Sequence, residues 1–471
     1  MSQHPLIHRV RFAATPGAGH FALSGLAALL LGAVAIATPA QNLPVAKTVP
    51  QKHFTVPPDV PTAIVLQAQP DAACDLHDAG VNDPAQTMKL YGNVEGYVRF
   101  HFTPNQDTQD AYLQLDCTAA GVATTYPVHL HVAASPTDDM PAPQRNIPAP
   151  AGSTIRPALT EDTAQLLSDE ELLAQKYPMR PNAAESPKSY AQWLNSVSHP
   201  MTIVPLHAVS RSDISHGSHS PQGTGVTEGV SSGTNDHWSG FVAEGWKNSL
   251  RAVEGSWTVP FILGTSSPDC YSSIWTGLDG WVGLDGLASN NVVQAGTEQD
   301  AAIMTKTGIL TQYYIWTEVW PQEPTAKQIA SAFPGDIISV YLYVGDSSGE
   351  IDPTGNYVWF TIENETEGQL YYSHTKLGTS FGFTGVSAEW IVERPIVGGY
   401  FLELPDYSFV ELDGAYVLKN TTWTTYSKAA TVQLTMRGNY DAPWYDNNVL
   451  STVTTDAYDD TEMIFYWKGF H

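Results

Sequence analysis

A chain of 471 residues is too long for one hydrophobic core, so we expect two or three domains. Asp and Glu number 48 against 22 Lys and Arg, and the formal net charge of −26 argues against a nucleic-acid partner, because phosphates attract basic surfaces. The same balance suits a protein that works in acid, where protonation of carboxylates relieves their repulsion. The 13 Trp and 22 Tyr favour β structure.

The N-terminal residues have the pattern of an export signal. Basic residues precede an apolar run over 21–37, and no Asp or Glu occurs before Asp59. Ala35 and Ala37 offer a cleavage site of small residues. An uncleaved membrane anchor is the alternative, but Ser and Gly interrupt the run, and we rank cleavage first. We therefore expect residues 1–40 to be a signal peptide. The remainder is then secreted or periplasmic, with no membrane attachment after cleavage.

Residues 41–135 look like a small β-sandwich domain, because three segments alternate between apolar and polar side chains: 97–102, 111–115 and 127–132. Cys74 and Cys117 lie in this region and are candidates for a disulfide in an exported chain, which leaves Cys270 as the odd cysteine. Three cysteines so far apart do not suggest a metal site. We expect no metal and no cofactor.

Residues 136–234 look like a linker with two short helices and a polar loop. Prolines crowd the start of this segment. Ser168 and Glu171 have the spacing of a capping box, which predicts one helix, and Ser186 followed by Pro187 predicts a second. From residue 209 onward the segment is rich in Gly, Ser and His. Gly229 to Gly233 matches GxSxG in form, but it lacks the preceding strand and following helix of a hydrolase elbow.

From 235 to 471, short β-favouring runs alternate with turn residues, which predicts a large antiparallel β-sandwich or barrel. In the run 386–393, alternation places Glu389, Ile391 and Glu393 on one face. Trp390 and its two apolar neighbours look like core. A carboxylate held on a rigid strand suits acid–base catalysis, although a solvated strand carboxylate has the same pattern.

Two further strands indicate a cleft for an extended substrate. Gln294 lies on the first, within 292–299, and faces away from the apolar Val293. The second, 312–320, places aromatic side chains and a carboxylate on one face: Tyr314, Trp316, Glu318 and Trp320. No HExxH motif, Asp-Thr-Gly or Asp-Ser-Gly occurs, so neither a zinc peptidase nor an aspartic-peptidase half-site is indicated.

Five blocks in order resemble the glutamic peptidases, the eqolisin family: 236–240, 253–260, 275–280, 293–297 and 387–393. The resemblance covers about half the chain. It implies a sandwich of two seven-stranded, concanavalin-like antiparallel sheets, with one sheet bent into a substrate groove. It also implies that Gln294 and Glu389 are the catalytic pair. The substrate-binding positions that we derive from it are Trp275, Asp279, Glu298, Tyr314, Trp316, Glu318 and Trp320. Gly-Leu-Asp-Gly occurs twice, so Trp281 and Asp285 are alternatives to the first two.

These observations predict a secreted, acid-acting endopeptidase that is a monomer and takes polypeptides as substrates. Glu389 would remove a proton from water and later return it to the leaving amine, while Gln294 would orient the water and stabilise the oxyanion. The rival interpretations are a non-catalytic lectin-like sandwich and a glycoside hydrolase that pairs Glu389 with Glu318 or Glu298. We also expect 136–234 to be a prosegment whose helices cover the groove and whose loop is cut in acid.

Overall fold

The computed structural model describes residues 47–58, 61–81, 87–93, 95–133, 149–184, 186–211, 214–216, 231–263, 270–304, 307–352, 354–398, 400–438, 449–456 and 458–469. The expected signal peptide and most of the polar loop, residues 217–230, lie outside these ranges. Residues 44–471 form one compact unit. Within the described ranges, no helix is long and apolar enough to cross a membrane.

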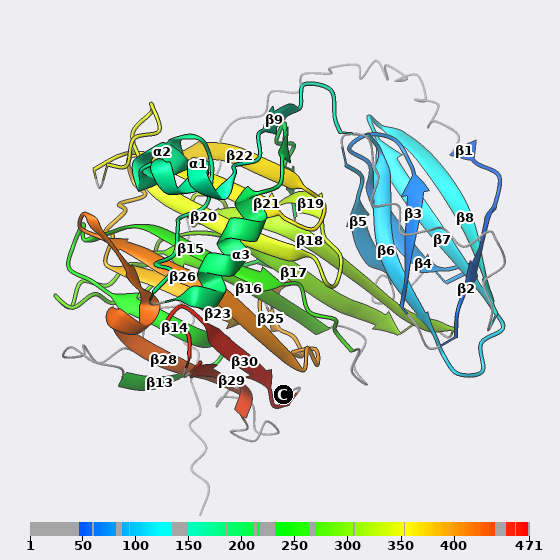
Figure 1. Ribbon diagram of the computed structural model, residues 1–471. Coiled ribbons are helices and arrows are strands. Elements are labelled where there is room, and N and C mark those ends of the chain that lie inside the picture. The colour runs from blue at the N-terminus through cyan, green and yellow to red at the C-terminus, as the bar shows by residue number, and fades with distance from the viewer. Residues whose placement is uncertain are drawn as a thin grey trace, which may run out of the picture. The chain divides into compact units, whose positions relative to one another are not determined.

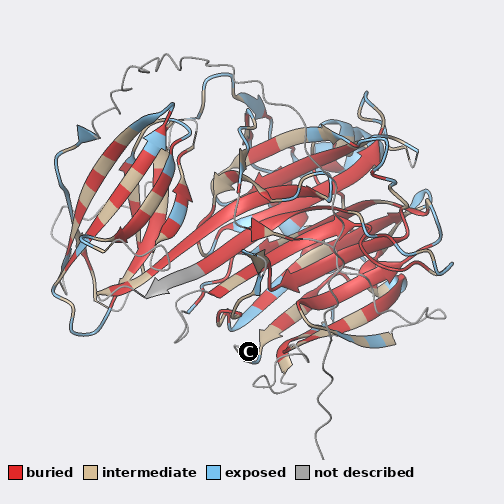
Figure 2. Cartoon of the chain, turned by 180° about the vertical axis from the view of Figure 1, so that it is seen from behind, coloured by how far each residue is buried: buried red, intermediate tan, exposed pale blue. Residues whose placement is uncertain are grey.

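The first region is built of β-strands (Figure 1). Six of them form one sheet in the order β1-β8-β7-β4-β5, with β2 also paired to β8, while β3 pairs with β6. Buried residues alternate with partly buried or exposed ones along β3, β7 and β8, as expected for strands with one face on a core (Figure 2). Cys74 and Cys117 form a disulfide between β4 and β7. The bounds are β1 (Lys47–Thr48), β2 (Lys52–Val56), β3 (Thr62–Gln67), β4 (Ala73–Asp78), β5 (Met88–Tyr91), β6 (Tyr97–Pro104), β7 (Asp110–Ala119) and β8 (Val122–Val132).

The helical segment has three helices, α1 (Glu161–Leu166), α2 (Asp169–Ala174) and α3 (Pro187–Val197), between strands β9 (Thr154–Arg156) and β10 (Met201–Val204). The predicted capping box of α2 is confirmed. The Ser186 side chain, in contrast, makes no cap hydrogen bond and donates to Asp460 instead. The short helix α1 was not predicted from the sequence.

The C-terminal region confirms the all-β prediction. One run of paired strands has the order β19-β18-β17-β16-β23-β14-β28, and a second has the order β26-β15-β20-β21-β22-β10. The pairs are antiparallel except for β10 with β22 and β13 with β28. The count of seven strands in each sheet stays a prediction.

The strands of this region are β11 (Val209–Ser210), β12 (Ile214–Ser215), β13 (Ser231–Asn235), β14 (Trp238–Glu244), β15 (Leu250–Thr258), β16 (Cys270–Leu278), β17 (Val292–Met304), β18 (Gly308–Trp320), β19 (Lys327–Ser331), β20 (Ile337–Gly345), β21 (Tyr357–Asn364), β22 (Gln369–Lys376), β23 (Ser387–Glu393), β24 (Ile396–Val397), β25 (Tyr400–Phe401), β26 (Phe409–Lys419), β27 (Thr422–Thr425), β28 (Ala430–Arg437), β29 (Val449–Thr455) and β30 (Met463–Trp467). A 3₁₀ turn, Tyr426–Lys428, follows β27.

The core lies between the two runs of strands. Trp390 and Val392 of β23 join the same apolar cluster as Val253 of β15 and Leu342 of β20. The alternation predicted for 386–393 is therefore confirmed. Glu389 lies on the opposite face of β23. This face of the sheet, turned away from the core, is its second surface.

The helices do not cover that second surface, so this part of the prosegment hypothesis is wrong. Met179, which follows α2, donates its backbone N–H to Glu254 on the outer face of β15. Arg156 of β9 forms a buried ion pair with Glu363 of β21. These contacts show that the helical segment packs on the β15–β20–β21 side (Figure 1).

Candidate active site

Three neighbouring strands bring Gln294 and Glu389 to one face. Gln294 of β17 and Glu389 of β23 are each the direct cross-strand partner of Gly277, which lies on β16 between them. Directly opposed residues of antiparallel strands have side chains on the same face. The two side chains therefore project over Gly277 from either side, with their Cα atoms roughly two strand spacings, about 10 Å, apart.

Gly277 keeps the space between the two side chains open. A Cβ atom at this position would lie 2.9 Å from the Val293 carbonyl oxygen and 3.2 Å from Cβ of Gln294. The first distance is shorter than normal contact, so a larger residue would displace the backbone or the Gln294 side chain. Position 277 must remain glycine for a molecule to bind between Gln294 and Glu389.

The next residues along the same strands extend the surface. Two residues along the strands from the pair, a row of directly opposed residues crosses the sheet: Trp316, Gly296, Trp275 and Ile391. Two residues further along lies the next row: Tyr314, Glu298, Ser273 and Glu393. All are buried or glycine. The structure thus places aromatic walls and two carboxyl groups beside the Gln/Glu pair, on the face predicted from the sequence.

Hydrogen bonds fix several of these side chains. Gln294 Nε2 donates to Glu318 Oε2 at 3.0 Å, which orients its amide. Trp275 Nε1 donates to Glu393 Oε2 at 2.6 Å, and Trp316 Nε1 donates to Ser273 Oγ at 3.1 Å. Each indole is held by its polar edge, so the aromatic surfaces are rigid.

Glu389 is fully buried, and burial raises the pKa of its carboxyl well above the usual value. The Ser387 side chain lowers this pKa to a smaller extent, and the nearby Asp279 raises it further. Among the described residues, no hydrogen bond of normal geometry reaches either oxygen of Glu389, nor the side-chain oxygen of Gln294.

The first Gly-Leu-Asp-Gly copy lies beside the pair. Asp279 accepts hydrogen bonds from the backbone N–H of Thr384 and Val386 and from the Thr384 hydroxyl, and burial raises its pKa to about 6. It therefore fixes the turn that leads into β23 rather than lining an open groove. Asp285 of the second copy is exposed and accepts from backbone N–H groups of its own turn and of Lys247. Trp320 is half-buried at the end of β18.

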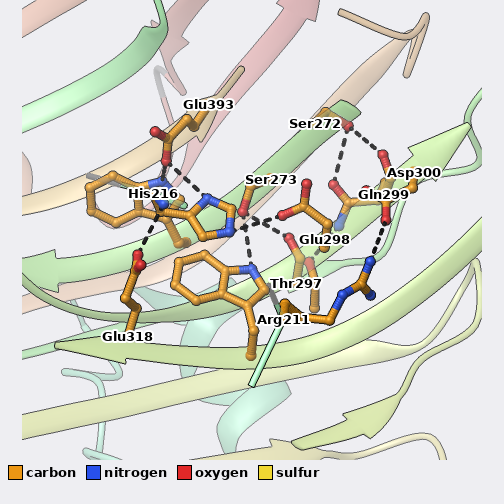
Figure 3. Close-up of polar contacts among 12 residues, drawn as sticks. Arg211, His216, Ser272, Ser273, Thr297, Glu298, Gln299, Asp300, Glu318 and Glu393 are labelled. Carbon is orange, nitrogen blue, oxygen red and sulfur yellow. Dashed lines mark hydrogen bonds and ion pairs between the residues drawn. The ribbon is translucent and has the colours of Figure 1, made fainter. Parts of the chain in front are cut away.

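His216 lies in this site, although the sequence placed it in a loop. Its ring stacks on Trp316, with centroids 3.9 Å apart and planes 6° apart. Nε2 lies 3.2 Å from Glu298 and Nδ1 lies 3.4 Å from Glu393 (Figure 3). The His216 backbone N–H donates to Glu318 at 3.0 Å, and its carbonyl accepts from Gln294 Nε2.

The charged groups around His216 shift one another's pKa. Burial alone lowers the pKa of His216, but the charges and hydrogen bonds of Glu298 and Glu393 outweigh burial and raise the pKa to about 10. Burial also raises the pKa of Glu298, and it raises that of Glu318 to about 8. The imidazolium is therefore the stable form at neutral pH.

Sequence reasoning missed Gly277, Glu393 and His216 as site residues. Glu393 shares the face of Glu389 by simple alternation, so that signal was present. Gly277 needed the strand register. His216 is 78 residues from Gln294 and has no strand pattern that points to the site. The described residues contain no group of three or more His, Cys, Asp or Glu suited to a metal ion.

Residues 236–462 match the model of the Peptidase A4 family, and this match supports a peptidase activity for this region. No curated protein matches the sequence.

Solved structures also align with this chain. The crystal structure of scytalido-glutamic peptidase with a transition state analog inhibitor aligns at 16% identity and a TM-score of 0.37. A second one, with a peptide-based transition state analog, aligns at 18% identity and the same TM-score. SCP-B, an Eqolisin family member in complex with the tripeptide Ala-Ile-His, aligns at 16% identity and a TM-score of 0.35. Each alignment covers 50% of this chain and 100% of the other.

Proposed function

We propose that the protein hydrolyses peptide bonds with Gln294 and Glu389 as a catalytic pair, through an activated water and without a covalent intermediate. One observation carries the proposal: Gln294 and Glu389 are both direct cross-strand partners of Gly277, so their side chains project on one face from its two sides. A water bound there lies within reach of both groups.

The steps follow from what each group can do. Ionised Glu389 takes a proton from the water, and the water oxygen adds to the substrate carbonyl carbon. Gln294 accepts from the water through its side-chain oxygen and donates through Nε2 to the developing oxyanion. Glu389 then gives its proton to the leaving amine as the C–N bond breaks. Glu318 fixes the amide orientation that this requires, because it accepts from the same Nε2.

The substrate is an extended polypeptide. The rows of Trp275, Trp316 and Tyr314 run away from the catalytic pair along the strands, and such a surface accommodates successive side chains of an extended backbone. The carboxyl groups of Glu298 and Glu393 at its far end favour a cationic side chain of the substrate there.

The proposal includes export, action in acid and a monomeric state, with a signal peptide over 1–40 and domains at 41–135, 136–234 and 235–471. The charge of −26 supports action in acid.

The test is digestion of casein and of polysaccharides at acid pH by the wild-type chain and by Glu389→Gln. We expect casein cleavage by the wild type alone and no release of sugars from the polysaccharides. A Glu389→Gln protein that still digests casein contradicts the mechanism. Binding of glycan without any hydrolysis would instead favour the lectin-like alternative.

A further inference from the structure

Two histidine side chains meet on one face of the first sheet. β2 pairs parallel with β8, and the register of this pair sets His53 directly beside His129. Their Nδ1 atoms lie 3.0 Å apart, although the residues are 76 positions apart in the sequence. Val128 and Leu130, on either side of His129, point into the core, so the two histidines lie on the face that is turned away from it.

A carboxylate decides which nitrogen of His129 carries hydrogen. His129 Nε2 lies 2.7 Å from Oδ1 of Asp110. An ionised carboxylate only accepts hydrogen bonds, so Nε2 is the donor, and Nδ1 of the neutral ring keeps its lone pair. A ring nitrogen that donates to a carboxylate while the other nitrogen is left as a ligand is the usual arrangement of metal-binding histidines.

Two further contacts hold the His129 ring in this orientation. Tyr112, its direct partner on β7, stacks on the ring, with centroids 4.6 Å apart and planes 4° apart. His131 Nδ1 lies 3.1 Å from the same oxygen of Asp110 and fixes the carboxylate from a second side. The lone pair of His129 therefore points toward His53 from a ring that is already positioned.

The separation of the two Nδ1 atoms matches two ligands of one metal ion. Bonds from imidazole to a metal are about 2.0–2.1 Å long, so two such bonds at a right angle place their nitrogens about 2.9 Å apart, and a tetrahedral angle places them about 3.3 Å apart. The observed 3.0 Å is closer to the right angle, which is the geometry of square-planar Cu²⁺. Without a metal, one hydrogen on His53 Nδ1 satisfies both atoms.

We propose that His53 and His129 bind a Cu²⁺ ion through their Nδ1 atoms. The ion takes the place of the one hydrogen between the rings, which leaves to solvent as a proton, and no oxidation state changes. Two protein ligands are fewer than the three or four of a zinc site, so water completes the coordination. We choose copper because Cu²⁺ has the highest affinity for nitrogen ligands among the divalent metals of its row.

The bound ion adds a second link between β2 and β8, besides their backbone hydrogen bonds. A ligand that binds only the folded chain stabilises it, so Cu²⁺ should raise the Tm of the protein. None of the residues that the proposed mechanism uses belongs to this site, and the inference is independent of peptidase activity.

The experiment counts the Cu²⁺ ions bound to the full chain by equilibrium dialysis at pH 7.5, in the Glu389→Gln background so that the chain is not digested. Other histidines also take up copper, so the readout is the difference between each variant and this parent chain. We expect His53→Gln and His129→Gln each to bind one ion fewer per chain. His199→Gln, at an exposed position just after α3, is the control and should bind the same number as the parent.

The supporting carboxylate gives a graded test. Asp110→Asn keeps both ligand nitrogens but removes the charge beside Nε2, and should weaken binding at this site by on the order of 10–100-fold. Affinity equal to that of the parent would show that Asp110 does not orient a ligand, and would overturn the site as described.

Three other results also overturn the inference. The first is an unchanged copper count in His53→Gln and His129→Gln, and the second is a loss in His129→Gln alone, because the ligand pair is then a different one. The third is a rise in Tm with Cu²⁺ that is as large in His53→Gln as in the parent. If circular dichroism shows His129→Gln unfolded, the exposed His53 decides alone.

Discussion

Gln294 and Glu389 are partners of the same residue, Gly277, from its two sides. The register of three strands therefore sets the distance between them, and neither side chain depends on a loop for its position. A pair mounted in this way keeps its geometry when bound peptides change, because the backbone ladder holds both members.

The first prediction concerns the catalytic pair. Glu389→Gln keeps the side-chain volume but cannot move a proton, so casein cleavage should be abolished. Gln294→Ala removes the oxyanion donor and should lower kcat by on the order of 10²–10³-fold. Glu411→Gln, the same substitution at an exposed carboxylate of β26, is the control and should keep wild-type activity. Comparable loss in the control would show a general effect of charge.

The second prediction concerns Gly277. Gly277→Ala puts a methyl group 3.2 Å from Cβ of Gln294 and should displace one member of the pair. A misplacement of about 1 Å costs on the order of 10²-fold in rate. Gly469→Ala meets no atom closer than 3.6 Å and serves as the control. Steady-state kinetics on casein peptides, with thermal unfolding as a check on folding, measure the effect. Full activity of Gly277→Ala would contradict binding of water above this residue.

The third prediction concerns stability and pH. Glu318 has its pKa raised to about 8 in the folded chain, so between pH 4.5 and 8 the folded state holds a proton that the unfolded state has lost. Stability from this group is therefore present in acid and is lost as pH rises through that window. The pKa of His216 is raised to about 10, so this group adds a further loss of stability as pH rises from 6.5 to 10.

The measurement is Tm against pH in the Glu389→Gln chain, which stays whole. We expect Tm to fall from pH 4.5 to 8. Adding Glu318→Gln, which is neutral throughout, should flatten this slope. An unchanged slope in the double variant would contradict the raised pKa of Glu318.

The fourth prediction concerns the helical segment. Arg156→Leu removes the cation beside the buried Glu363 and should destabilise the chain by roughly 3–5 kcal/mol, because one charge remains buried and unpaired. Arg180→Leu breaks a partly exposed pair with Asp169 and should cost about 0–1 kcal/mol. Denaturant unfolding in the Glu389→Gln background compares the two. Equal losses would show that the segment is not docked through Glu363.

The sequence by itself determined the features that depend only on residues close together in the chain. Alternation along β23 separates Glu389, Ile391 and Glu393 from the core residues Trp390 and Val392, because successive side chains of any strand point to opposite faces. The same reasoning places Trp316 and Glu318 together. The ordered blocks that resemble glutamic peptidases predict Gln294 as a catalytic residue without any structure, and this stays a prediction. The capping box at Ser168 is likewise a signal contained in four residues.

Only the tertiary structure decided which of these elements meet. Alternation cannot say which strands are neighbours, so the position of Gly277 between Gln294 and Glu389 depends on long-range pairing. The helices were expected over the groove, yet the helical segment packs beside Glu254 and Glu363, which accept from the backbone N–H of Met179 and pair with Arg156 of β9. His216 enters the site from a polar loop because three glutamates and Trp316, brought together from three strands, form a pocket for its charged ring. Such a pocket has no signature in any one stretch of sequence, since its members become neighbours only when the sheet forms.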